Sequence, residues 1–315
     1  MYEKWKGVHT RCAFNMIQEL IPLTRPRTLA AALGPTILGA AFSYYAFGAV
    51  QGTGLAIFHT ILIFLAVVTA QIVANLWNEY KDFKSGLDAG QKIGNAGSIT
   101  RGVITPELII TMIKVLMFVP IIIGLYLSAT ITWYYIPVGF LCILISFLYS
   151  GGPKPISRTP FGEISSGIAM GFAIILITGY AWIRELSLAL LIPAIPSTLL
   201  VGSIMLTNNI RDIRNDESHG RHTLPIVLGR ERALSLMSIS YIFNFIWIIA
   251  WIIVGHMTWF ALLAFLAAPL AFKTIHTLST NTDEFQLDKA MGTTAGAAMI
   301  YQLMWAIGLI MGKLF

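Results

Sequence analysis

Two short polar stretches interrupt an otherwise apolar sequence, and both carry oxygen-rich side chains. The first, residues 75–88, follows the apolar run 54–74 and contains Asn75, Asn78, Glu79, Asp82 and Asp88. At about 3.6 residues per helical turn, the first four fall on one helical face, so their oxygens can converge on one point. Such a cluster suits Mg²⁺, which takes one or two carboxylates and leaves its other positions to water and phosphate oxygens. By itself, the stretch is equally consistent with a solvated helix end.

A second polar stretch, residues 208–216, follows the apolar run 186–207. Its residues Asn208, Asp212 and Asp216 are spaced i, i+4 and i+8, so they also share one helical face. Carboxylates at the end of a hydrophobic helix are costly to hold near lipid unless they have a partner. A matched pair of such faces at the ends of two apolar helices indicates one site that is built in two halves.

Two Mg²⁺-binding faces with basic loops around them suit a diphosphate, because the metal ions bridge its oxygens and stabilise its charge as it leaves. The candidate cationic partners are Lys84, Arg101, Lys154, Arg211 and Arg221. Among these we expect Arg211 and Lys154, followed by Arg101, to contact a diphosphate or carboxylate. The alternative for each one is a positive charge that only sets membrane topology.

A diphosphate that leaves an allylic carbon creates a carbocation, which aromatic faces can stabilise. The rings near the two helix ends are Trp77, Tyr80, Phe83, Phe147 and Tyr149. We favour Tyr149, because it adjoins the turn Gly151-Gly152-Pro153 on the same side of the membrane. For each ring, packing or anchoring at the membrane interface is the alternative.

The composition is that of a membrane protein. Of the 315 residues, 56% are hydrophobic and only 11% are charged, whereas soluble domains carry about 25% charged residues. The net charge of +6 arises from basic residues between apolar segments, which fits membrane topology and anionic substrates better than nucleic acid. Cys12 and Cys142 form neither a disulfide scaffold nor a metal motif. Residues 1–27 lack the apolar core of a cleaved signal peptide.

Apolar segments long enough, or nearly so, to cross a bilayer recur along the whole chain, since a crossing needs about 20 helical residues. The nine segments are 28–49, 54–80, 106–129, 132–150, 161–183, 186–210, 233–255, 257–277 and 290–313. We therefore expect an all-α integral membrane protein, with nine transmembrane helices around a central cavity and a single domain over residues 1–315.

Lys and Arg residues set the expected orientation. They gather in residues 1–27 and in the loops after segments two, four, six and eight, whereas the other loops hold only Arg184. The positive-inside rule places the N-terminus in the cytoplasm and the C-terminus outside. Both polar stretches then face the cytoplasm, in the expected active-site loops 81–105 and 211–232. A secondary transporter is the alternative from another class, but transporters place such carboxylates near the bilayer midplane. A non-catalytic membrane scaffold is a third reading.

These motifs resemble those of the UbiA superfamily of intramembrane prenyltransferases. The stretches that carry the resemblance are 23–29 (LTRPRTL), 75–88 (NLWNEYKDFKSGLD), 149–153 (YSGGP), 208–212 (NNIRD) and 220–224 (GRHTL). Within the superfamily, they are most similar to the 1,4-dihydroxy-2-naphthoate polyprenyltransferases of menaquinone biosynthesis. Segment layout and motif separation agree with this resemblance.

The resemblance implies that Asn78, Asp82 and Asp88 supply the first Mg²⁺ face. Asn208, Asp212 and Asp216 then supply the second. Two features depart from the commonest family pattern. Glu79 stands where many members have Asp, so its ligand role stays open, and the longer spacing from Asp82 to Asp88 is a feature of the naphthoate branch.

The implied reaction joins a polyprenyl diphosphate to 1,4-dihydroxy-2-naphthoate, with loss of CO₂ and diphosphate, to give demethylmenaquinone. The resemblance also implies a multi-pass protein of the bacterial cell membrane. Such a protein contacts lipid, and its active site faces the cytoplasm. The nearest rival is the same chemistry on another acceptor, such as 4-hydroxybenzoate, homogentisate, a chlorophyllide, haem or a glycerol phosphate. Acceptor choice resides in the shape of the cavity, which the sequence leaves open.

Overall fold

The computed structural model describes residues 20–87 and 98–315, and all regular elements within these ranges are helices. This confirms the expected all-α class. The main helices are α2 (Ala30–Phe47), α3 (Thr53–Ser85), α4 (Pro106–Thr130), α5 (Tyr135–Ser150), α7 (Ala173–Ile183), α8 (Leu191–Arg211), α11 (Arg230–Ile253), α12 (Ala268–Thr280) and α13 (Glu284–Leu314). Short segments connect or extend them: η1 (Pro26–Leu29), η2 (Ile156–Arg158), α6 (Gly162–Ser166), η3 (Gly167–Phe172), η4 (Leu188–Leu190), α9 (Ile213–Ser218), α10 (Leu224–Leu228) and η5 (Trp259–Ala267).

Among the described residues, eight helical stretches are long and apolar enough to cross a membrane. They are 26–47, 53–85, 106–130, 162–183, 188–211, 230–253, 259–280 and 284–314. The remaining apolar helix, α5, has 16 residues, which corresponds to about 24 Å against a hydrocarbon core of about 30 Å. The expected count of nine spans therefore stays a prediction.

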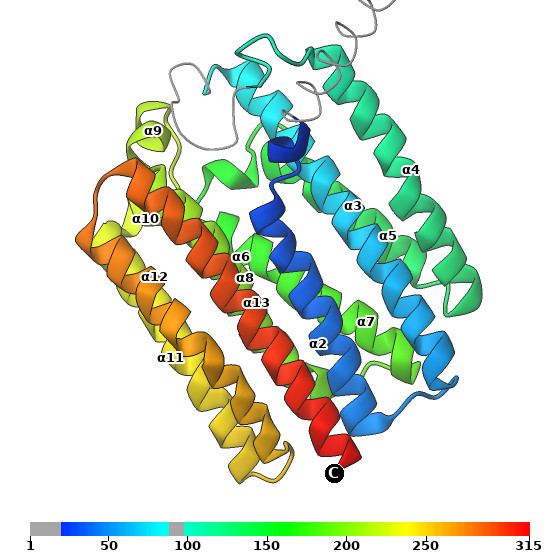
Figure 1. Cartoon of the computed structure of the whole chain (residues 1–315). Coiled ribbons are helices and arrows are strands. Elements are labelled where there is room, and N and C mark those ends of the chain that lie inside the picture. The colour runs from blue at the N-terminus through cyan, green and yellow to red at the C-terminus, as the bar shows by residue number, and fades with distance from the viewer. Residues whose placement is uncertain (1–19, 88–97) are drawn as a thin grey trace, which may run out of the picture.

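The helices form one bundle (Figure 1), and the spans that contain α2, α8 and α13 are its most buried ones. Helix α13 packs against α2, α8, α12 and η5, and α3 packs against α2, α4 and α5. Tyr301 and Trp305 on α13 are fully buried, and the Tyr301 hydroxyl donates to the backbone carbonyl of Asn244 on α11 at 2.6 Å. In Figure 1 the C-terminus lies at the opposite end of the bundle from α9.

Helix α3 continues beyond the predicted end of its apolar segment at Tyr80. Its backbone stays helical to Ser85, and Gly86 then ends it in the left-handed conformation, with φ of 75°, which costs glycine little. The hydropathy pattern stops earlier because the last turns are polar. Asp82 therefore lies on the helix, as its expected helical face with Asn75 and Asn78 requires, although the predicted loop 81–105 begins before it.

The fifth predicted span is continuous from Gly162 to Ile183 but changes its winding within the membrane. Its middle, η3, is π-helical, a form that often marks functional sites. Glycines let this segment approach α8 closely: a Cβ atom at Gly171 would lie 2.6 Å from the Ser197 carbonyl oxygen and from the backbone of Thr198. The contact brings η3 and α8 to two walls of the same cavity.

Replacing Gly171 by Ala should destabilise the protein, because the backbone of α8 would have to move away from η3. Overpacking of this kind costs about 1–3 kcal/mol. The measurement is the midpoint of thermal unfolding in detergent. Gly124→Ala on α4 is the matched control, since a Cβ there meets nothing within 4 Å. Equal midpoints for the two variants would contradict the close contact.

Candidate functional site

The last turns of α3 build the first half of the site. Asn78 and Asp82 lie one turn apart, and the Asn78 amide Nδ2 donates to Asp82 Oδ2 at 3.0 Å. The Asn78 carbonyl oxygen accepts a hydrogen bond from the Ser150 hydroxyl on α5 at 2.7 Å. The Asn78 side chain is therefore fixed at both ends, and it joins α3 to α5.

Glu79 departs from the expected shared face. It is only 1% exposed, and its Oε1 accepts a hydrogen bond from the backbone N–H of Ser98 at 3.2 Å. It does not line the cavity that Asn75, Asn78 and Asp82 line. Glu79 thus attaches the loop before α4 to α3. The companion residue Asp88 lies outside the described residues.

The second half of the site is at the end of α8. This helix stops at Arg211, and Asp212 caps it before the short helix α9 begins. The predicted uninterrupted face through Asn208, Asp212 and Asp216 is therefore broken at Asp212, whose backbone angles leave the helical region. The break matters little for Asp216, because its backbone N–H still donates to the Asp212 carbonyl at 2.9 Å.

Arg211 is fully engaged with protein groups. Its Nε and Nη2 each donate to Asp212 at 2.7 Å, in the paired geometry of a guanidinium on a carboxylate. Nη2 also donates to Asn208 Oδ1 at 2.9 Å, and Nη1 donates to Asp288 Oδ1 at 2.9 Å. Arg211 therefore fixes the carboxylate and amide of the second motif and connects them to α13.

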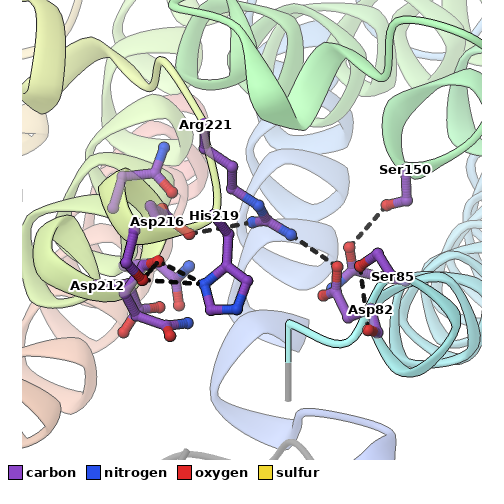
Figure 2. A network of polar contacts seen from close by, with 12 residues as sticks. Asp82, Ser85, Ser150, Asp212, Asp216, His219 and Arg221 are labelled. Atoms are coloured by element: carbon purple, nitrogen blue, oxygen red, sulfur yellow. Dashed lines mark hydrogen bonds and ion pairs between the residues drawn. The ribbon is translucent and has the colours of Figure 1, made fainter. Parts of the chain in front are cut away.

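Arg221 joins the two halves. Its Nη2 donates to Asp82 Oδ1 at 2.6 Å, and its Nη1 lies 3.3 Å from Asp216 Oδ1. Figure 2 shows the guanidinium between the two carboxylates, with Ser150 on the far side of the α3 group. The loop that carries Arg221 folds back after α9, and its backbone N–H donates to the Asp216 carbonyl at 2.9 Å. Asp82 and Arg221 are 139 residues apart in the sequence, so this contact connects distant parts of the chain.

A cavity of about 220 Å³ opens between these groups. Its polar lining includes Arg25, Arg27, Gln71, Asn75, Asn78, Asp82, Tyr149, Asn208, Arg211, Asp212, Asp216, Arg221 and Asp288. Its apolar lining lies further from the helix ends and includes Ala74, Ile145, Met170, Val201 and Ile204. Such a combination can hold the charged head of a ligand above an apolar chain.

The structure thus brings most of the predicted site residues together. The described metal candidates, Arg211 and Tyr149 all line this cavity. Lys154 and Arg101 do not line it, and both are exposed; Arg101 donates to the Ser98 hydroxyl at 3.3 Å. The predicted contacts of Lys154 and Arg101 with a diphosphate or carboxylate are therefore not placed in this cavity.

Two acidic residues, the half-buried Asp288 and the buried Glu163, were missed by the sequence analysis. Asp288 on α13 accepts hydrogen bonds from both Arg211 and Arg27, at 2.9 and 2.7 Å. Glu163 on α6 is 5% exposed and accepts a hydrogen bond from Asn209 Nδ2 at 2.8 Å. Neither residue sits in a motif of repeated oxygen ligands. The only signal in the sequence was an acidic residue at the start of an apolar segment.

Asp216 has an unusual electrostatic environment. Its side chain is 3% exposed, and burial raises its pKa to about 7, with further upward contributions from the Asp212 and Asp82 carboxylates, although Arg221 lowers it. Burial disfavours the charged form, and neighbouring negative charges add to the effect. The charged form of Asp216 is therefore disfavoured, and an added cation beside it would stabilise that form.

The oxygen donors fit Mg²⁺ better than a metal that needs nitrogen or sulfur ligands. No group of three or more His, Cys, Asp or Glu side chains within residues 20–87 and 98–315 could hold a metal ion. The cavity instead offers Asp82 with Asn78 from α3, and Asp212 and Asp216 with Asn208 from the second motif. One or two carboxylates per ion, completed by water and phosphate oxygens, is the usual coordination of Mg²⁺.

The fold is shared with solved structures of low sequence identity. A UbiA homologue from Aeropyrum pernix superposes with a TM-score of 0.68, at 18% identity, over 90% of this chain and 97% of the other. A UbiA homologue from Archaeoglobus fulgidus bound to DMAPP and Mg²⁺ gives 0.59, at 16% identity, over 92% and 99% of the two chains.

Closer relatives are similar over nearly their whole length. The 1,4-dihydroxy-2-naphthoate octaprenyltransferase of Bacillus subtilis is 34% identical over 94% of this chain and 93% of its own. The protein of the same name from Mycobacterium tuberculosis is 28% identical over 92% and 96%. A model of the UbiA prenyltransferase family matches residues 32–307. These matches confirm the resemblance carried by the two acidic motifs, and the chain belongs to the UbiA prenyltransferase family.

Proposed function

We propose that the protein transfers a polyprenyl group from polyprenyl diphosphate to 1,4-dihydroxy-2-naphthoate, as a step of menaquinone biosynthesis. The observation that carries this proposal is the meeting of both acidic motifs in one cavity, where Arg221 contacts Asp82 and Asp216. The relatives that match nearly the whole chain are named 1,4-dihydroxy-2-naphthoate octaprenyltransferases, and their names support this acceptor.

The acidic motifs are proposed to hold two Mg²⁺ ions. Asn78, Asp82 and Asp88 would supply one face, and Asn208, Asp212 and Asp216 the other. When bound, Mg²⁺ neutralises the charge that develops on the departing diphosphate. UbiA homologues from Archaeoglobus fulgidus bound to DMAPP or GPP with Mg²⁺ support the use of this metal ion. Arg211 acts through its contacts with Asp212 and Asn208, which it holds in place.

The donor half of the reaction breaks the allylic C–O bond. Diphosphate leaves with the bonding electron pair, and the prenyl carbon becomes an allylic cation. The ring of Tyr149 lines the cavity and is proposed to stabilise this cation through its π face. Apolar neighbours such as Ile145 and Met170 exclude water from the same cavity, so the cation survives until the acceptor attacks.

The acceptor half forms one carbon–carbon bond and breaks another. The ring carbon that bears the carboxylate attacks the prenyl cation, assisted by electron release from the ring hydroxyls. The bond to the carboxyl carbon then breaks, its electron pair restores the aromatic ring, and CO₂ leaves. The product is the quinol form of demethylmenaquinone.

The membrane placement is part of the proposal. We infer one membrane domain over residues 1–315, with α5 as the ninth span and the N-terminus in the cytoplasm of a bacterial cell. The polar site lies at the α9 end of the bundle, opposite the C-terminus (Figure 1). The positive-inside rule assigns this end to the cytoplasm. Loop 211–232, which supplies Arg221, then closes the site from that side, and Arg101 and Lys154 contribute charge near its entrance.

The decisive test of the reaction is turnover by purified protein in lipid bilayers. We expect 1,4-dihydroxy-2-naphthoate, a polyprenyl diphosphate and Mg²⁺ to yield the prenylated, decarboxylated quinol, detected by mass spectrometry, and a chelator to abolish it. Product only with another phenol would retain the reaction class and reject this acceptor. No product with any acceptor tested would contradict the proposed chemistry.

Removing the Asp82 carboxylate should abolish most activity without unfolding the protein. We expect Asp82→Asn to lower kcat by at least about two orders of magnitude, because the leaving diphosphate loses electrostatic stabilisation. Glu107→Gln is the matched control, since Glu107 is an exposed carboxylate in the first turn of α4 and lies away from the cavity. Near-normal turnover of Asp82→Asn, with Mg²⁺ present, would refute the ligand assignment.

The raised pKa of Asp216, about 7, predicts pH-dependent metal binding. A metal ion needs the ionised carboxylate, so protons compete with it below this pKa and affinity rises with pH. Between pH 6 and pH 8 we expect affinity for Mn²⁺, a spectroscopic substitute for Mg²⁺, to rise by about tenfold. Electron paramagnetic resonance of the substrate-free protein measures this, and Asp216→Asn should bind more weakly with a flatter profile. Identical pH profiles would show that Asp216 is not a ligand.

A further inference from the structure

The backbone at Arg25 is strained. Its φ is 51°, and only one other non-glycine residue in the described part of the chain, Arg184, has a positive φ. The left-handed conformation brings the Cβ atom of an L-residue too close to its own backbone, and the following Pro26 restricts this position further. Strain of this kind persists only where the surrounding structure imposes it, and it concentrates at functional sites.

Two side chains of α3 hold the backbone on both sides of Arg25. Asn75 Nδ2 donates to the Thr24 carbonyl at 3.1 Å, and Gln71 Nε2 donates to the Thr28 carbonyl at 2.7 Å. The two donors are four residues apart on α3. The two acceptor carbonyls, of Thr24 and Thr28, are also four residues apart, and Arg25 lies between them. Within this clamp, the Thr28 backbone N–H and hydroxyl both donate to the Arg25 carbonyl at 2.8 Å.

The clamp belongs to the same helical face as the first acidic motif. Gln71, Asn75, Asn78 and Asp82 follow the spacing i, i+4, i+7 and i+11, and all four line the cavity. Leu23, next to the clamped segment, is 2% exposed and packs in one apolar cluster with Leu76 of α3. The helix that presents Asp82 thus also determines where Arg25 lies.

Arg25 differs from the other arginines that line the cavity. Arg27 is bound to Asp288, Arg211 to Asp212 and Asp288, and Arg221 to Asp82 and Asp216. Arg25 is half-buried and, within the described part of the chain, has neither a hydrogen bond from its side chain nor an ion pair. It is nevertheless close enough to Asp82 and Tyr149 to act on both electrostatically.

We propose that Arg25 is a receptor for a substrate oxyanion, and that Gln71 and Asn75 are the residues that position it. A guanidinium pairs with two oxygens of a carboxylate or a phosphate in a fixed geometry. The proposal rests on the proposed function, which supplies two such groups: the diphosphate of the donor and the carboxylate of the acceptor. The strained backbone is the cost of presenting this cation to the cavity.

Binding measurements on detergent-solubilised protein show which of the two ligands Arg25 contacts. Isothermal titration with inorganic diphosphate in the presence of Mg²⁺, and separately with 1,4-dihydroxy-2-naphthoate, gives a Kd for each. Arg25→Gln should weaken the ligand that Arg25 contacts by at least about tenfold and leave the other unchanged. Arg25→Lys should recover part of the loss. Arg214→Gln is the matched control, since Arg214 is exposed on α9 outside the cavity.

Stability distinguishes a binding role from a structural one. Glycine adopts positive φ without strain, so Arg25→Gly should keep a thermal midpoint at least equal to that of the native protein while binding as weakly as Arg25→Gln. A lower midpoint for Arg25→Gly with unchanged Kd values would overturn the proposal. The same holds if Arg25→Gln binds both ligands as tightly as the native protein.

The positioning role has its own test. Gln71→Met keeps the side-chain length but removes the donor to Thr28, so it should weaken the same ligand as Arg25→Gln, by a smaller factor. In the double variant the two effects should not multiply, since both act through one guanidinium. Multiplicative effects would assign Gln71 an independent role. Native protein that binds diphosphate but not the naphthoate would reject only the acceptor, whereas binding of neither ligand would overturn both proposals.

Discussion

The bridge from Arg221 to Asp82 and Asp216 is the interaction on which the site depends. Without a cation between them, two buried carboxylates would repel each other across the interface of α3 and the loop after α8. Charges of this kind are tolerated in a low-dielectric interior only when they are paired and hydrogen-bonded. The guanidinium supplies both conditions with one side chain, since its two terminal nitrogens reach different helices. It therefore holds the two motifs together.

Helix α3 organises the parts around this bridge. The side chains of its polar face contact three different parts of the chain. Gln71 and Asn75 bind the N-terminal segment, Asn78 binds Ser150 of α5, and Asp82 binds Arg221. Each contact uses a donor or acceptor that would be costly to leave unpaired within the bundle. The same face thus positions the proposed metal ligands, the strained Arg25 and the helix that carries Tyr149. Arg211 and Asp288 give the second motif a comparable connection to α13.

The location of the polar groups agrees with an enzyme that meets its substrates at the membrane surface. They gather at one end of the bundle, and the apolar lining of the cavity lies deeper along the same helices. A secondary transporter would place its carboxylates at midplane and on broken helices. The π-helical turn at η3 does interrupt a span within the membrane, but it brings Met170 and Ala169 to the cavity wall and carries no charge.

The sequence by itself determined the helical class, the membrane environment, the two acidic motifs and the family, because these follow from composition and from spacing within single helices. A period of about 3.6 residues fixes which side chains share a face, whatever the helix later packs against. Only the tertiary structure decided that Asp288 holds Arg211, that Glu79 contacts the loop before α4, and that Arg221 connects the halves. It also decided that Lys154 and Arg101 do not line the cavity. Those outcomes depend on how helices cross and where loops fold back, which many weak contacts between distant segments set together. The spacing of residues within one helix therefore does not predict these contacts.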